Sequence, residues 1–248
     1  MTYHILGDSI QFLNVVLEPN EKFIAEAGAM IYMDYGLDYE AKMSTNNKNI
    51  FSQIMQGIKR KISGEDIFLV HYKNKISEPQ MLGISGPYVG QIEKVNLNNI
   101  KNNTLYLQKG AFLAGDYGIE IGIGLTFNIG RGFFGGEGFI LQKIKGDTNY
   151  NEQNVFFHAR GTIIERELDN ETILLEPGCL VGYTDGIKFD IETISSIKNM
   201  IFDDEGIFLA KLSGTGKVFI QNLPYDKFIS QITSEITSNE NLLNLFKN

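Results

Sequence analysis

The side chains that most often carry metal binding or covalent catalysis are few in this sequence. Its three histidines, His4, His71 and His158, are scattered along the chain, although a metal centre needs several ligands that converge. The single cysteine, Cys179, has no histidine near it in the sequence, whereas a thiolate nucleophile needs a partner that lowers its pKa. These residue types favour structural roles, and we expect no cofactor, no metal and no catalytic residue.

A polar side chain recurs two positions before three glycines that head the same motif. The residues are Glu26, Gln108 and Glu176. If the three copies of the motif surround a common axis, these side chains could ring that axis and bind a cation or a polar ligand. The competing interpretation is that alternation along a strand places a polar, outward-facing residue at this position. The sequence leaves both interpretations open.

The motif is a pair of glycines eight positions apart, followed by a stretch in which apolar and polar residues alternate. Its copies start at Gly28, Gly110 and Gly178. In the second copy, isoleucine occupies every second position from Ile119 to Ile123. This period of two predicts β-strands with one buried face. A second landmark, a glutamate before a short apolar run, recurs at Glu65, Glu137 and Glu205.

Repetition with this spacing is typical of folds built from copies of one supersecondary unit. We predict an all-β fold of three repeats related by a pseudo-threefold axis, with one connecting helix. The repeats are residues 64–127, 136–192, and 205–222 combined with 9–43, so that the third is split between the termini and the copies close into a ring. They form a single β domain over residues 1–222, followed by a C-terminal helical tail over 223–248.

Helical periodicity is strongest between residues 50 and 62. The residues that we expect on one interaction surface of this helix are Ile50, Phe51, Ile54, Met55, Ile58, Lys59 and Arg60. An apolar stripe beside a basic end could lie on anionic lipid or dock a partner protein. Packing of the same stripe on the protein's own sheet is the competing interpretation.

Bulk composition narrows the function classes. The chain has 248 residues, a formal net charge of −8 and 43% hydrophobic residues, so it is long enough to bury a core without disulfides. The acidic balance disfavours a nucleic-acid partner, because phosphate binding depends on clustered Lys and Arg. No stretch is typical of a membrane span or of an N-terminal targeting segment. With one cysteine and no internal disulfide, we expect a cytoplasmic location.

Several ordered motifs resemble those of a known family. They are residues 17–21, 26–30, 59–65, 110–114, 134–138 and 209–221. Over residues 10–222 the pattern is similar to an uncharacterised prokaryotic family related to the mitochondrial biogenesis protein named for altered inheritance of mitochondria. The resemblance implies a fold like that of the tryptophan-RNA-binding attenuator protein, a short double-stranded β-helix repeated three times. It implies no reaction.

The chain departs from the family pattern in two ways. Residues 147–153 replace the short Gly-x-Gly loop found at residues 214–216, and from the sequence we expect no transit peptide before the domain. The mitochondrial relatives are associated with organisation of the inner membrane and of respiratory complexes. Because of the second departure, we do not carry a mitochondrial role over to this chain.

The function that these observations favour is that of a non-enzymatic binding or scaffold protein that forms a homo-oligomer. Peripheral docking on a membrane or on another protein is compatible with it. The alternative is a small-ligand or metal-binding protein, or an enzyme, with a site on the pseudo-threefold axis near Glu26, Gln108 and Glu176. RNA binding by analogy of fold is a third possibility, which the net charge disfavours.

Overall fold

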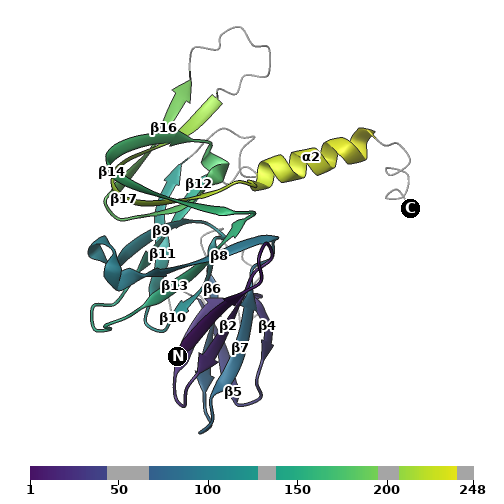
Figure 1. Ribbon diagram of the computed structural model, residues 1–248, viewed down its shortest axis with the longest axis vertical. Coiled ribbons are helices and arrows are strands. Elements are labelled where there is room, and N and C mark those ends of the chain that lie inside the picture. The colour runs from purple at the N-terminus through teal and green to yellow at the C-terminus, as the bar shows by residue number, and fades with distance from the viewer. Residues whose placement is uncertain (44–66, 128–137, 195–206, 239–248) are drawn as a thin grey trace, which may run out of the picture.

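A computed structural model describes residues 1–43, 67–127, 138–194 and 207–238, and almost all of its regular structure is β-strand (Figure 1). The strands are β1 (Thr2–Leu6), β2 (Phe12–Leu17), β3 (Lys22–Glu26), β4 (Met30–Met33), β5 (Leu37–Met43), β6 (Phe68–Asn74), β7 (Gln80–Ser85), β8 (Gly90–Asn96), β9 (Thr104–Gln108), β10 (Phe112–Asp116), β11 (Glu120–Phe127), β12 (Phe139–Lys145), β13 (Asn154–Arg160), β14 (Ile163–Leu175), β15 (Leu180–Thr184), β16 (Ile187–Ile194) and β17 (Ile207–Gln221). Helix α2 spans Tyr225–Ser238, and short 3-10 turns lie at Leu97–Asn99, Lys101–Asn103 and Pro177–Cys179. The prediction of an all-β fold is confirmed.

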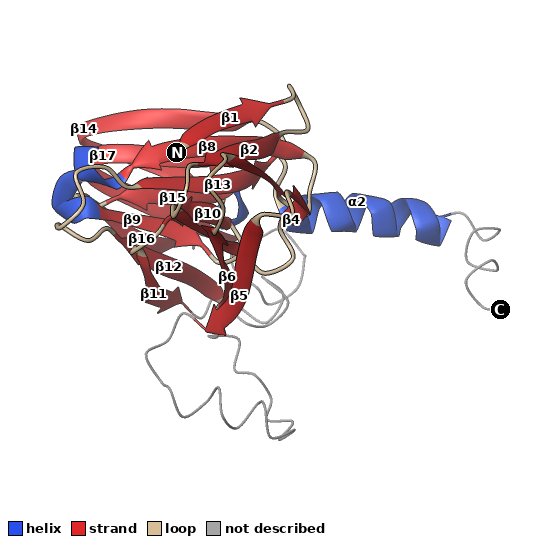
Figure 2. Cartoon of the chain, turned by 90° about the horizontal axis from the view of Figure 1, so that it is seen from below, coloured by secondary structure: helices blue, strands red, loops and turns tan. Residues whose placement is uncertain are grey.

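The strands form three sheets with the orders β1-β2-β7-β4, β5-β6-β3-β10-β13-β8 and β11-β12-β9-β15-β17-β14, and β16 pairs with β17 beside the last of them. In Figure 1 the N-terminal strands lie at the lower end of the molecule, whereas β14, β16 and β17 lie at the upper end. Helix α2 projects away from the sheets in this view and in Figure 2. Among the described residues, no helix is both long enough and apolar enough to cross a membrane.

The strand pairings repeat in three consecutive groups, which we call the first, middle and last strand sets (residues 12–85, 90–160 and 163–221). Each set has two three-stranded layers: β2-β7-β4 with β5-β6-β3, then β8-β13-β10 with β11-β12-β9. In the last set the long strands β14 and β17 each serve both layers, with β15 and β16 completing them. Two ladders join the sets, β3 with β10 and β9 with β15.

The glycine motif forms a tight turn in each set, and the same backbone hydrogen bond closes all three turns. The carbonyl of the residue two positions before the motif glycine accepts a hydrogen bond from the backbone N–H three residues later: Glu26 from Ala29 at 3.1 Å, Gln108 from Ala111 at 2.9 Å, and Glu176 from Cys179 at 2.9 Å. Gly28 and Gly110 have φ angles of 92° and 83°, which only glycine adopts without strain. The last copy makes a 3-10 turn over Pro177–Cys179 instead, with Pro177 at its first position.

A polar side chain at the end of the next strand is also equivalent in the three sets. Each accepts a hydrogen bond from a backbone N–H of a neighbouring strand: Asp34 from Met81 at 2.7 Å, Asp116 from Asn154 at 2.7 Å, and Thr184 from Lys217 at 2.9 Å. These shared contacts explain why the spacing of the motif recurs in the sequence. Relation of the sets by a threefold axis remains a prediction.

Ring closure is not seen in the hydrogen-bonded ladders. Between described residues, no ladder joins β14, β15, β16 or β17 to β2, β3, β4 or β5. The predicted repeats are residues 64–127, 136–192, and 205–222 combined with 9–43. They begin and end at other points of the repeating pattern than the three strand sets do. The split third repeat therefore also stays a prediction.

The hydrophobic core is shared between the sets. Its central cluster takes Ile24 and Leu69 from the first set, Leu107 and Phe157 from the middle set, and Phe219 from the last. Two further clusters fill the interiors of the first and last sets. The expected helix of residues 50–62, with all of its interaction residues, lies outside the described residues, as does the end of the tail from residue 239.

Candidate functional site

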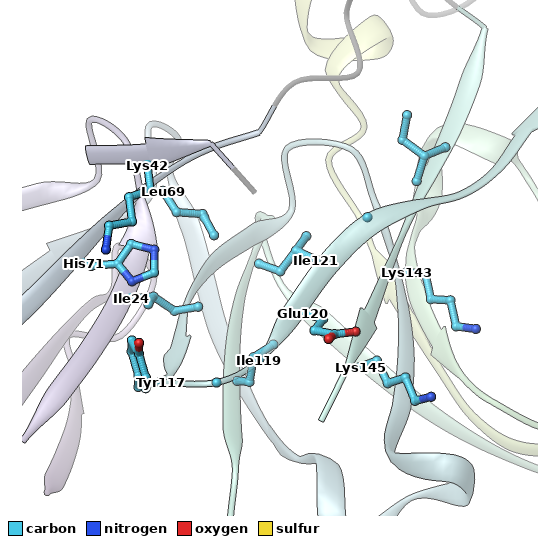
Figure 3. Close-up of a pocket in the computed structure, with 13 residues that line it drawn as sticks. Ile24, Lys42, Leu69, His71, Tyr117, Ile119, Glu120, Ile121, Lys143 and Lys145 are labelled. Carbon is cyan, nitrogen blue, oxygen red and sulfur yellow. The ribbon is translucent and has the colours of Figure 1, made fainter. Parts of the chain in front are cut away.

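A cleft of about 540 Å³ opens where the first strand set meets the middle set (Figure 3). Its apolar wall consists of Ile24 from β3, Leu69 from β6, and Ile119 and Ile121 at the start of β11. These side chains lie together because the β3–β10 ladder joins the two sets directly beside the turn that leads into β11. The cleft thus depends on the junction between two sets.

The charged side chains that line the cleft are mostly cationic. Lys42 lies on one side, and Lys143 and Lys145 of β12 lie on the other, while Glu120 is the one carboxylate among the described residues of the lining (Figure 3). Lys42 also forms an ion pair with Glu40, with 2.9 Å between Nζ and Oε2. A basic cleft is notable in a chain whose formal net charge is −8.

His71 lies on the wall of the cleft next to Tyr117, with the two rings edge to face and 5.9 Å between their centres. Burial, followed by the nearby charge of Lys42, lowers the pKa of His71, so its imidazole is neutral at physiological pH. Its Nδ1 atom is buried and has no hydrogen-bond partner among the residues that the structure describes. The amino group of Lys22 lies 4.5 Å from the centre of the Tyr117 ring.

This combination of side chains suits binding rather than covalent chemistry. An apolar wall can take up a hydrocarbon group, and lysines at the rim can attract an anionic head. The cleft could not be predicted from the sequence, because Lys42, Tyr117 and Lys143 are far apart along the chain and only the strand pairing brings them together. No signal in their spacing would have identified it.

The three equivalent residues before the motif glycines have different surroundings. Burial raises the pKa of Glu26, which is half-buried at the end of β3. Gln108 lines a very small pocket beside His158. Glu176 forms an ion pair with Lys227 of α2.

Two of these turns are linked through Gln221. Its side-chain amide donates to the carbonyl of Gly178 at 2.8 Å, and it lines the same small pocket as Gln108. No contact described in the structure extends this link to Glu26. The axial site formed by Glu26, Gln108 and Glu176 therefore remains a prediction.

The remaining candidates for chemistry have environments that explain them structurally. His158 is 5% exposed, its ring is stacked on that of Tyr88 at 6.0 Å, and burial lowers its pKa. Burial raises the pKa of the Cys179 thiol, with the Glu176 carboxylate as a second cause, which is opposite to the activation of a nucleophile. Within the described part of the chain, no group of three or more His, Cys, Asp and Glu residues could hold a metal ion.

The sequence matches one known protein family over most of its length. Residues 3–223 match the family described as mitochondrial biogenesis AIM24. The chain belongs to the AIM24 family. The match covers all three strand sets and ends just before α2.

A solved structure has a similar fold. A protein of Streptococcus pyogenes, determined by X-ray crystallography in a structural genomics programme, superimposes with a TM-score of 0.69 at 19% sequence identity. The alignment covers 94% of this chain and 99% of that protein. No curated protein matches the sequence. The two proteins thus share a fold at low sequence identity, and fold alone assigns no activity.

Proposed function

We propose that this member of the AIM24 family is a non-enzymatic binding or scaffold protein that self-associates. One observation carries the proposal: strand β4 is exposed, although its counterparts in the other two sets are buried. Met30, Ile31 and Tyr32 are 44%, 54% and 39% exposed. In β10 and β15, by contrast, every residue is buried.

The exposed strand is also chemically suited to association. Its residues are as apolar as those of a buried strand, and its outer edge has no ladder partner among the described residues. Unpaired backbone groups and apolar side chains at a sheet edge favour pairing with another chain. Cover by a second protein surface would remove both from water.

Measurement of the mass in solution tests the proposal. Light scattering over a range of concentrations should give multiples of the 27.9 kDa chain mass, with the fraction of assembled protein rising with concentration. A mass of one chain at every concentration would contradict it. Ile31→Glu is the matched variant, because it places a charge on the exposed edge without touching the core, and it should shift the mass towards one chain.

We also propose that the three strand sets are related by a pseudo-threefold axis and that the protein is cytoplasmic. The repeated turns and ladders support a pseudo-threefold relation between the strand sets, and the lone Cys179 supports a reducing compartment such as the cytoplasm. An experimental structure in which the sets superimpose about one axis would test the first point. Localisation of the protein in its native cell would test the second.

The cleft supports a second candidate function, the binding of an anionic amphiphile. Lysines beside an apolar wall fit a carboxylate or phosphate attached to a hydrocarbon chain. Titration with a long-chain fatty acid should give saturable binding that Lys143→Ala with Lys145→Ala weakens. Lys94→Ala, an exposed lysine on β8, should leave binding unchanged. Equal binding by all three proteins would rule the cleft out.

A further inference from the structure

The exposed strand β4 has a complement at the other end of the molecule. In the two junctions inside the chain, the strand that follows one motif turn, as β4 does, pairs with the strand that ends at the preceding motif turn. Strand β10 pairs in this way with β3, and β15 with β9. The corresponding strand of the last set is the C-terminal half of β14, which ends just before Glu176. On its outer side this segment has no ladder partner among the described residues.

The two free edges carry side chains that the internal junctions bury. Leu174 is 51% exposed, whereas Ile24, at the same distance before its motif turn, is 1% exposed. Likewise, Ile31 is 54% exposed, whereas Leu113 at the equivalent position is 1% exposed. Both edges therefore have the apolar composition of a junction without the neighbour that would cover it.

The internal junctions also have the same register. In the first junction Ala114 pairs with Ala25, and in the second Gly182 pairs with Leu107. Positions are counted from the first residue of each motif turn, which is Glu26, Gln108 or Glu176. In both junctions, the residue six positions after one of these (114 after 108, 182 after 176) pairs with the residue one position before the preceding one (25 before 26, 107 before 108). Applied to the free edges, the same rule places Tyr32 opposite Leu175.

We propose that β4 of one copy pairs antiparallel with the C-terminal half of β14 of a second copy of this chain. The inference rests on the proposed self-association and names its surfaces and register. The expected pairs are Tyr32 with Leu175, Met33 with Leu174, and Asp34 with Ile173. The contact is head-to-tail, so each added copy presents a new free edge, and assembly continues until a ring closes or a filament forms.

The surroundings of β4 are compatible with this contact. The Tyr32 ring packs over Gly83 of β7, and its hydroxyl donates to Oδ1 of Asn14 at 2.5 Å, so the ring lies over its own sheet. In the junction between the middle and last sets, the equivalents of Met33 and Leu174 are Tyr183 and Tyr106, whose rings stack with 5.1 Å between centres. The side chains of Met33 and Leu174 should likewise share one face and touch.

A second copy fits the free edge better than the same chain does. Figure 1 places β4 among the strands at the lower end of the molecule and β14 at the upper end. Contact between them within one chain would require the strand sets to bend towards each other, against the two ladders and the shared core that join them. Pairing between copies requires no such rearrangement.

Cross-linking tests the register directly. In a Cys179→Ala background, Met33→Cys and Leu174→Cys are made as two separate proteins and mixed with a short thiol-reactive cross-linker. Alanine already occupies the place of Cys179 in the other two turns, at Ala29 and Ala111, so the background should fold. A covalent dimer is expected in the mixture and not in either protein alone. Ile164→Cys, on the exposed N-terminal half of β14, is the matched control for Leu174→Cys and should not cross-link to Met33→Cys.

The outcomes separate this inference from the proposed function. Oligomers in light scattering without the Met33–Leu174 cross-link would overturn the pairing and leave self-association standing. A single-chain mass with no cross-link would overturn both. A double Met33→Cys, Leu174→Cys protein that cross-links only within one chain would show that the ends close on themselves, which also overturns pairing between copies. In the assembled protein, Leu174→Lys should weaken association by about tenfold or more, because it places an unpaired charge in the contact.

Discussion

Strands β4 and β10 occupy the same place in their strand sets and differ chiefly in what lies beside them. Both follow a motif turn, both contain a bulge after their first residue, and both pair with the central strand of their layer. Strand β10 is entirely buried because β3 runs along its other edge, whereas β4 is open there. Burial at this position is therefore decided by the neighbouring set rather than by the strand's own sequence.

The largest expected effect on stability comes from truncating the side chain at the equivalent position of the two strands. Leu113→Ala should lower the free energy of unfolding by about 2–5 kcal/mol, because it leaves a cavity in a packed core. Ile31→Ala, at the equivalent exposed position, should change it by no more than about 0.5 kcal/mol. Urea denaturation at low protein concentration measures both. Similar losses would show that β4 is covered in the free chain and would break the comparison.

A smaller contrast is expected for the carboxylates that end these strands. Asp116 is 6% exposed and accepts hydrogen bonds from the Tyr3 hydroxyl and from the backbone N–H and side chain of Asn154. Asp116→Ala should cost about 1–3 kcal/mol, since it leaves buried donors unsatisfied.

The matched change is Asp34→Ala, where the bond from Met81 N–H is exposed. Water can replace this acceptor, so the cost should stay below about 1 kcal/mol. Thermal unfolding of the two variants beside the parent protein gives the difference. An equal loss of stability at both positions would mean that the first strand set is as tightly enclosed as the middle set.

The smallest effect concerns the turn residues and depends on pH. Burial raises the pKa of Glu26, so the folded chain holds this proton more tightly than the unfolded chain. This difference adds to the free energy of unfolding at pH values below the pKa of Glu26 in the unfolded chain. The contribution is lost as the pH rises through the pKa of Glu26 in the folded chain. Glu26→Gln should therefore stabilise the protein at pH 7, by less than the losses above, and have little effect at pH 4.

Glu176→Gln is the control for this pH dependence. Its carboxylate forms a surface ion pair with Lys227, and such pairs contribute little to stability. Chemical denaturation at the two pH values should show a pH-dependent gain for the Glu26 variant and almost none for the Glu176 variant. Destabilisation of the Glu26 variant at pH 7 would point to a cationic partner for this residue, which the axial-site hypothesis requires.

Local features of the fold could be predicted from sequence because their causes are local. The alternation from Ile119 to Ile123 predicts a strand, and β11 occupies that stretch. Gly28 and Gly110 predict tight turns, and both have the positive φ that such turns need. Membership of the AIM24 family was also indicated by ordered motifs and is confirmed by the match over residues 3–223.

Contacts between strand sets could not be predicted in this way. Lys42 and Lys143 meet at one cleft only because β3 pairs with β10, and neither residue carries a local sign of that pairing. The ring of three sets was inferred from repetition, yet the described ladders join only consecutive sets. Repetition indicates that similar units exist and leaves open which of their edges meet.

By itself, the sequence determined the β-strands, the turns between them and the repetition of one pattern, since alternation, glycine φ and short-range hydrogen bonds act over a few residues. Only the tertiary structure decided which copies of the pattern are enclosed. Ile31 and Leu113 have similar hydrophobic side chains in equivalent strands, and one lies in water while the other lies in the core. The difference arises because burial depends on a neighbour supplied by a distant part of the chain, which for β4 we propose to be a second copy.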